Sequence, residues 1–557
     1  MRWLLLACLL VVPVSAQAEV VIYINKDLTT GSNNGTSSAN AYRGVNALER
    51  FRAGSGGSTI DRVIFEGAGT YREMFSTVTT RIKTDISFTA STRTITSASS
   101  NFTSLGFQTG DIIRVLGSAS NDRQFTVGTV GTTTMTVAST NTMADESAGE
   151  SINITAVNRG ANLAALDPGG SAGATRYRRW QFNGSTIDSG ITLTEANGYT
   201  WTQSAANPAE WYVRRSDGSN PSLVQPFCGV IAGVFVDDSA DLDPDMGTVG
   251  SLTGSATPSG AVSPMGWGDN DSLGYSTVYV ASAVNPESLT VRVGQVPAGV
   301  STTWAWHSFE DGIFELGNRN STSSTGYGVG ISNRSASTWY IKRCIFRYQS
   351  LHAIDHSNTG TTEAVSNLSY FSGHRHAALN ADGALRIYNS VDYGSHLFAL
   401  ITSGVTGAGS LTIRNSISAY NEAGVIAKGS ATAVLTEDHN IWWPRFGASG
   451  GALGYTQTAN WTTTAASDFP PSAATTISTQ AANLAAGAVD PLFVSPSLTS
   501  VQATDFKLQS ASAGRWTGQH VMFARDMRNR RFHSSNPSRG IYEFGAGDPA
   551  GSRAARN

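Results

Sequence analysis

The chain carries little charge and almost no cysteine for its length. Only 14% of its 557 residues are charged, and the formal net charge is −3. Without an excess of basic residues the chain has no positive electrostatic field to bind nucleic acid, so we exclude nucleic acid as a partner. Beyond the first residues no apolar run is long enough to cross a membrane, and no extended helical pattern stands out. A membrane is therefore excluded as a partner too.

The N-terminus has the organisation of an export signal. A basic start at Arg2 precedes an apolar run over residues 3–14 and a small-residue site that ends at Ala18. This pattern predicts a secretory signal peptide cleaved after Ala18, and therefore a secreted or periplasmic protein. Beyond it, Cys228 and Cys344 could form one disulfide in an oxidising compartment, but we expect two separate buried thiols.

What the sequence does contain is a repeat. Apolar residues recur at intervals of 23, 23, 26 and 24, each inside an alternating apolar and polar run typical of a half-buried strand. A second short strand follows each of the first four. Units this short leave no room for a crossover helix, so we expect a solenoid in which each coil pairs in parallel with the next. An antiparallel sandwich is the alternative. The recurring residues are Ile345, Leu368, Val391, Ile417 and Ile441.

Small or amide side chains stand directly before each of these apolar residues. Stacked coils would place them in one column, where we expect side chain to hydrogen-bond to side chain from coil to coil, as in amide ladders. The members of this column are Cys344, Asn367, Ser390, Ser416 and Asn440.

Both ends of the chain resemble those of a known superfamily. A strand at 21–25 leads into an Asn/Gly/Ser-rich loop, an expected short helix at 44–52 and a G-T-Y-R-E motif ending at Glu73. The segments 490–493 and 540–545 resemble the closing part of the same proteins. The chain thus resembles bacterial right-handed parallel β-helix proteins of the pectate-lyase-like superfamily. The resemblance implies an all-β, right-handed parallel β-helix, a fold that hosts lyases, hydrolases, epimerases, adhesins and phage spikes.

The chain divides into six expected parts. A Ser/Thr-rich part resembles a small β domain that is common as an insert in phage and bacterial surface proteins. The parts are the signal peptide (1–18), an N-terminal cap with the first coil (19–74), the inserted β module (75–160), an irregular β region or lateral insertion (161–300), the central coils (301–505), and a C-terminal cap and tail (506–557).

Histidines are concentrated in the central coils, where five of the nine fall within 45 residues. Residues two or four apart in a strand share a face, so we expect His374 beside His376 and His352 beside His356, with Arg375 pointing the other way. Coils lie about 4.8 Å apart, which would let three consecutive coils form one patch. The candidate catalytic residues are His352, His356, His374, Arg375, His376 and His396.

Such a patch suits β-elimination of a uronate. A cation must neutralise the C6 carboxylate, and a base with a pKa near neutrality, as histidine has, must remove H5. We therefore predict a polysaccharide lyase acting on an extracellular, anionic glycan. The candidate substrate-binding residues are Lys342 and Arg347 as further cations, Tyr348 and Tyr393 as acids, and Trp442 and Trp443 as stacking rings or solenoid caps.

Four other interpretations stay open. Stacked histidines can be structural residues satisfied by their neighbours, or they can bind a transition metal. A glycoside hydrolase on the same fold would need paired carboxylates, whereas the central aspartates are spread among coils. A non-catalytic surface, adhesion or phage-spike-like carbohydrate-binding protein is the fourth, supported by the inserted module. The aspartates in question are Asp355, Asp382, Asp392 and Asp438.

No cofactor is required for this chemistry, but one segment could hold calcium. Asp241, Asp243 and Asp245 place acidic oxygens at alternate positions, as a hard cation prefers. The glutamate that closes an EF-hand loop is missing, because position 252 is leucine. An exposed acidic loop is the alternative.

Overall fold

The computed structural model describes residues between 19 and 543, with gaps of ten or more residues at 44–59, 157–177, 216–227, 244–264, 318–328, 444–453, 464–475 and 478–492. The expected signal peptide (1–18) and the expected helix at 44–52 therefore lie outside the described residues. Within the described ranges, no helix is both long and apolar enough to span a bilayer.

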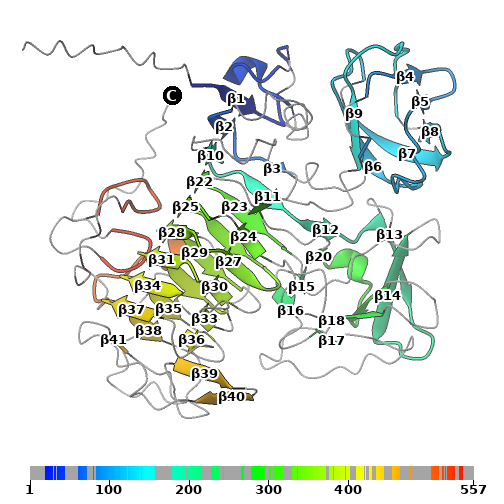
Figure 1. Ribbon diagram of the computed structural model, residues 1–557. Helices are drawn as coiled ribbons and strands as arrows, with labels where there is room; N and C mark the ends of the chain where they lie inside the picture. Colours follow the sequence, from blue (N-terminus) through cyan, green and yellow to red (C-terminus); the bar gives the residue numbers. More distant parts are fainter. Residues whose placement is uncertain are drawn as a thin grey trace, which may run out of the picture.

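Three long sheets run side by side along the molecule (Figure 1). Sheet A contains β1 (Val21–Ile24), β2 (Arg62–Phe65), β10 (Arg178–Gln181), β22 (His307–Glu310), β25 (Thr338–Lys342), β28 (Thr361–Val365), β31 (Ala384–Tyr388), β34 (Ser410–Arg414) and β37 (Val434–Asp438). Sheet B contains β3 (Thr70–Tyr71), β11 (Thr186–Asp188), β23 (Ile313–Glu315), β26 (Ile345–Arg347), β29 (Leu368–Tyr370), β32 (Val391–Tyr393), β35 (Ile417–Ala419), β38 (Ile441–Trp443) and β41 (Thr476–Ile477).

Sheet C contains β21 (Val300–Thr302), β24 (Val329–Asn333), β27 (His352–His356), β30 (Arg375–Leu379), β33 (Leu397–Ile401), β36 (Ile426–Lys428), β39 (Gly454–Thr458) and β40 (Asn460–Thr463). Except for the terminal pair β39 and β40, neighbouring strands in all three sheets are parallel. From β22 to β38 the chain passes from sheet A to B to C and back, one strand per sheet per coil. The predicted right-handed parallel β-helix is confirmed, and with it the register of the apolar column.

The apolar column of sheet B faces away from the lumen of the solenoid. Leu368, Val391 and Ile417 form a core cluster with the C-terminal residues Phe506 and Ile541, which lie across this outer face. The alternating residues of the same strands point inward instead, and they form the column Phe346, Ser369, Asp392, Ser418 and Trp442. The C-terminal segment thus covers one side of the solenoid, and the lumen behind it is partly polar.

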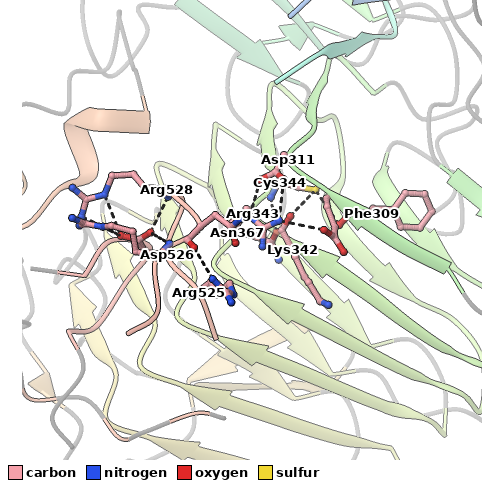
Figure 2. A network of polar contacts seen from close by, with 12 residues as sticks. Phe309, Asp311, Lys342, Arg343, Cys344, Asn367, Arg525, Asp526 and Arg528 are labelled. Atoms are coloured by element: carbon pink, nitrogen blue, oxygen red, sulfur yellow. Dashed lines mark hydrogen bonds and ion pairs between the residues drawn. The ribbon is translucent and has the colours of Figure 1, made fainter. Parts of the chain in front are cut away.

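Two residues join sheet A to sheet B in each central coil, and the first of them makes the corner. The corner residues Arg343, Ser366, Asn389 and Asn415 have φ between 51 and 57°, the left-handed conformation that turns the chain sharply. Arg343 is buried there, and its guanidinium bonds Asp311, the corner residue one coil before, at 2.7 and 2.9 Å (Figure 2). Charge-assisted pairs of this kind can fix the spacing of successive corners.

The small-residue column after this corner is a ladder of a different kind from the one predicted. The Asn367 amide oxygen accepts the backbone N–H of Cys344 at 2.9 Å (Figure 2). Its Nδ2 donates to the carbonyl of Ile341, also at 2.9 Å. Asn440 bonds the N–H of Ser416 in the same way. The predicted bonds between side chains are therefore replaced by bonds from side chain to backbone, because the corner leaves main-chain groups that the sheets do not pair.

Cys344 itself is a free and fully buried thiol, as expected, and burial raises its pKa to about 12. Its Sγ lies 3.5 Å from the carbonyl oxygen of Lys342. The side chain of Cys228 is not among the side chains that the structure describes.

Two insertions interrupt the first coils, each starting after a strand of sheet B. The first is a six-stranded antiparallel unit around its own apolar core. It contains β4 (Ile86–Thr89), β5 (Thr94–Ser97), β6 (Ile112–Leu116), β7 (Gln124–Val130), β8 (Thr134–Val137) and β9 (Asn153–Ala156). We call it the inserted barrel, because bridges between Thr79 and Thr155 and between Lys83 and Ile152 close it.

The second is a lateral module of two small sheets. Its strands are β12 (Gly190–Thr192), β13 (Tyr199–Gln203), β14 (Glu210–Arg215), β15 (Cys228–Ile231), β16 (Val234–Asp237), β17 (Leu242–Asp243), β18 (Met265–Gly268), β19 (Thr277–Ala281) and β20 (Val291–Gly294). Short 3-10 helices occur at η1 (Ser38–Asn40), η7 (Pro286–Ser288) and η9 (Ala503–Phe506).

Candidate functional site

Sheet C brings one histidine and one arginine into register. His352 begins β27 and Arg375 begins β30, and the two residues are direct partners in the parallel pairing of these strands. Neighbouring strands lie about 4.8 Å apart, so the two side chains leave the sheet next to each other. The sequence predicted that Arg375 points away from its strand neighbours His374 and His376, and the register adds that it lies beside His352 of the preceding coil.

Both side chains belong to the outer face of sheet C. The next residues along the two strands, Ala353 and His376, point into the lumen. Ala353 belongs to the main core cluster there, and the His376 ring stacks on the Phe398 ring with 5.0 Å between the ring centroids. Side chains alternate along a strand, so His352 and Arg375 point outward. Ile354 also belongs to the core cluster, and the alternation therefore slips by one residue after Ala353.

This slip places Asp355 on the outer face as well. Its carboxylate accepts hydrogen bonds from Ser332 of β24 at 2.7 Å and from Ser357 at 2.5 Å. The three outer residues are largely shielded, since His352 is 3% exposed, Asp355 5% and Arg375 8%. Burial lowers the pKa of Arg375 to about 10, which still leaves the guanidinium cationic at neutral pH. We call these three residues the outer triplet.

His376 lies instead in a polar network inside the lumen. Its Nδ1 is 2.6 Å from Ser369 Oγ, and this hydroxyl donates a 2.5 Å hydrogen bond to Asp392. The Asp392 carboxylate also accepts from Ser395 at 2.7 Å and from Asn421 at 2.5 Å. None of these side chains is exposed to solvent, so a glycan outside the solenoid cannot reach them.

Burial controls the charge of this network. It lowers the pKa of His376 to about 3 and raises the pKa of Asp392 to about 7, the latter against the opposing hydrogen bonds of Ser369, Ser395 and Asn421. At neutral pH the imidazole is therefore neutral. The network gives each of these buried polar side chains a hydrogen-bond partner inside the solenoid. The sequence analysis did not predict it, although Ser369 and Asp392 directly follow residues of the apolar column.

Three histidine candidates remain, and the structure describes only His356 among them. His356 is fully buried, and its Nδ1 lies 2.8 Å from the hydroxyl of Thr362, a lumen residue of sheet A. Burial lowers its pKa too. The spacing had predicted that His356 shares a face with His352, and the structure instead places the two on opposite faces of sheet C. His374 and His396 lie outside the described residues.

The predicted substrate-binding residues lie on other sheets. Lys342 is on the outer face of sheet A, and Trp442 is inside the lumen, 5.2 Å from Phe398. Tyr348 is half-buried and Tyr393 is buried, both within the cluster beneath the C-terminal segment. The side chain of Trp443 is outside the description. The structure therefore does not bring these residues together with His352.

Arg347 belongs to an ion network at the root of the lateral module. It pairs with Glu315 and donates a 3.1 Å hydrogen bond to the hydroxyl of Tyr370. Arg292 of β20 bridges Glu315 and Asp188 at 3.1 and 2.6 Å. These contacts tie the module to sheet B, which gives Arg347 a structural partner.

The predicted calcium segment has no described side chains, since Asp241 and Asp245 lie outside the described residues and only the backbone of Asp243 is placed. In the part of the chain that the structure covers, no group of three or more histidine, cysteine, aspartate or glutamate side chains could hold a metal ion.

No protein-family model and no curated protein matches the chain. Among solved structures, a similar chain is described as "The complex structure of XylC with xylose". The two share 10% identity with a TM-score of 0.29, over 52% of this chain and 60% of that one. A similarity this weak carries no argument. The fold rests on the strand pairing, and membership of the pectate-lyase-like superfamily stays a prediction.

Proposed function

We propose that the protein is a secreted polysaccharide lyase that cleaves an anionic, uronate-containing glycan at the outer triplet. The observation that supports this most is the register of sheet C, which sets His352 beside Arg375 on one face. A base next to a fixed cation is the minimum that β-elimination from a uronate requires. The surrounding solenoid holds both groups on strands rather than on loops.

The reaction assigns one task to each group. The Arg375 guanidinium neutralises the C6 carboxylate of the bound sugar, which acidifies H5. His352 removes that proton, the electron pair forms the C4–C5 double bond, and the bond from C4 to the glycosidic oxygen breaks. The leaving oxygen takes the proton from the imidazolium, directly or through a water molecule, and this transfer restores the neutral base. Asp355 is the carboxylate on the same face and can stabilise the imidazolium.

The experiment is to incubate the purified protein with alginate, pectate and glycosaminoglycans and to follow the ultraviolet absorbance of the unsaturated uronate. We expect product from at least one of these polymers. His352→Ala and Arg375→Gln should each abolish its formation while the far-ultraviolet circular dichroism stays unchanged. Absence of unsaturated product on every polymer contradicts the lyase, and normal cleavage by both variants contradicts the site.

Non-catalytic glycan binding is the second candidate. The lumen positions of His356 and His376 favour it, because both imidazoles have structural partners there. The outer triplet is also shielded, and cleavage requires that a glycan reach it. Binding of the polymers without any unsaturated product would support this second function.

A further inference from the structure

The outer face of sheet A pairs aromatic with cationic side chains. In β25 the buried residues Trp339 and Ile341 alternate with the half-exposed Tyr340 and Lys342, and the Lys342 ammonium lies 4.9 Å from the centroid of the Tyr340 ring. The same combination returns two coils later in β31. There Arg386 is exposed and Tyr388 half-exposed, and the pattern of burial is again alternating.

Positive charge exceeds negative charge on this face. From β25 to β34 its outward side chains include three cations, Lys342, Arg386 and Arg414, and one carboxylate, Glu363. No ion pair joins these three cations to a carboxylate among the described residues. Tyr388 is the register partner of Arg414, and Arg386, two residues before Tyr388 on the same face, is the register partner of Glu363.

The carboxylates at the two ends of this stretch reduce that excess without cancelling it. Glu310, one coil before β25, is the register partner of Lys342, and it lies 3.9 Å from the exposed Arg179 of the coil before it. Asp438, one coil after β34, is the register partner of Arg414, and its carboxylate lies 2.8 Å from the imidazole of His439. A local cationic excess therefore stands in a chain whose formal net charge is −3.

These side chains stand in two neighbouring columns of sheet A. Lys342, Tyr388 and Arg414 belong to one column, and Tyr340 and Arg386 belong to the next. Coils repeat at about 4.8 Å, so Lys342 and Arg386 stand two coils apart and Arg414 follows one coil later.

Tyr388 packs in part against Ala524 and Phe532 of the C-terminal segment and is half-exposed, as is Tyr340. Cations on several coils, with one tyrosine in each column, fit a polymer with a carboxylate on successive sugars, because the accessible parts of the rings can pack on the apolar faces of the pyranoses. A compact anion would contact only one of the cations.

We propose that this surface, the sheet A platform of Tyr340, Lys342, Arg386, Tyr388 and Arg414, binds a carboxylated polysaccharide lying along the solenoid axis. The platform shares with the proposed function only the class of ligand. It lies on a different sheet from His352, so it holds the polymer whether or not the outer triplet cleaves it.

The test is affinity electrophoresis of the full chain in native gels that contain alginate, polygalacturonate or neutral dextran. We expect retardation by the two polyanions and not by dextran. The variant K342Q/R386Q/R414Q should bind the polyanions about tenfold more weakly, as the loss of three exposed ion pairs of modest strength would predict. Glu363→Gln removes the opposing carboxylate and should bind more tightly, and both effects should shrink as salt is added.

The matched control is Arg123→Gln, which removes an exposed cation from the inserted barrel and should leave the affinity unchanged. Thermal unfolding of each variant shows whether it is folded. Equal retardation by dextran and alginate, unchanged affinity of the triple variant, or weaker binding by Glu363→Gln would each overturn the platform. Failure of the lyase is distinguishable, because it removes product formation and leaves this binding intact.

Discussion

The hydroxyl of Ser369 lies 2.5 Å from a carboxylate oxygen of Asp392 inside the lumen, and neither side chain is exposed. Because burial raises the pKa of Asp392 to about 7, the folded chain holds a proton there that the unfolded chain releases near its ordinary pKa, about 3.9. The stability from this group is fully present below that unfolded value and is lost as the pH rises through the folded pKa.

Asp392→Asn should remove this dependence on pH. Relative to the unmodified protein, the variant should gain free energy of unfolding as the pH rises from about 4 to about 7, by up to about 4 kcal/mol at 1.4 kcal/mol per pKa unit. Urea denaturation at several pH values measures this difference. A difference that stays constant with pH would mean that Asp392 does not titrate in this range.

His376 should have the opposite effect. Burial lowers its pKa to about 3, so its contribution to stability is present above the unfolded pKa, about 6.5, and is lost as the pH falls through the folded one. Replacing it with asparagine keeps a polar atom near Ser369 but removes the titration. His376→Asn should lose less stability than the unmodified protein between about pH 6.5 and pH 3. Urea denaturation at several pH values measures this difference, and an acid limb as steep in the variant as in the unmodified protein would contradict the prediction.

The Asn367 side chain should contribute more to the free energy of unfolding than Ser390, its neighbour in the ladder. Asn367→Ala leaves the buried N–H of Cys344 and the carbonyl of Ile341 without this partner, which costs about 1–3 kcal/mol for each unsatisfied group. Ser390→Ala removes two longer bonds, from the N–H of Asn367 at 3.3 Å and to the carbonyl of Tyr388 at 3.2 Å, and it should cost less because that carbonyl also accepts from the N–H of Ser366. Denaturant unfolding ranks the two variants, and equal losses would contradict the ladder.

Phe506 should hold the C-terminal segment on sheet B. It is 1% exposed and packs against Tyr393 and Phe493 at 5.3 and 5.1 Å between ring centroids. Phe506→Ala should cost about 3–5 kcal/mol and should increase the binding of a fluorescent apolar dye, because the outer column becomes accessible. Lys507→Ala is the neighbouring control. A folded variant with unchanged dye binding would show that the segment stays in place without Phe506.

The fold could be predicted because its period is written in the sequence. Each coil repeats the same pairing, so Leu368, Val391 and Ile417 had to lie in one column whatever the details of the corners. Which face of that column is the lumen could not be predicted. Both faces of sheet B are buried, one by the solenoid itself and the other by a segment distant in sequence, so alternation alone does not distinguish them.

The site could be predicted only in part. Grouping His352 with Arg375 and the other candidates on sheet C depends on strand spacing, which the repeat supplies. To decide that His352 partners Arg375, while His356 and His376 face inward, the register must be known to the exact residue. An error of one residue would move every side chain to the opposite face. The slip after Ala353 leaves no mark in the sequence pattern.

The corner between sheets B and C has a consequence for how such a protein can change. Both the inserted barrel and the lateral module leave the solenoid after a strand of sheet B, β3 and β11, while the pairing of β2, β10 and β22 in sheet A continues without a break. That corner can therefore accept a whole folded unit without disturbing the coils on either side. It works as a grafting point, at which accessory domains can be exchanged while the rest of the molecule stays the same.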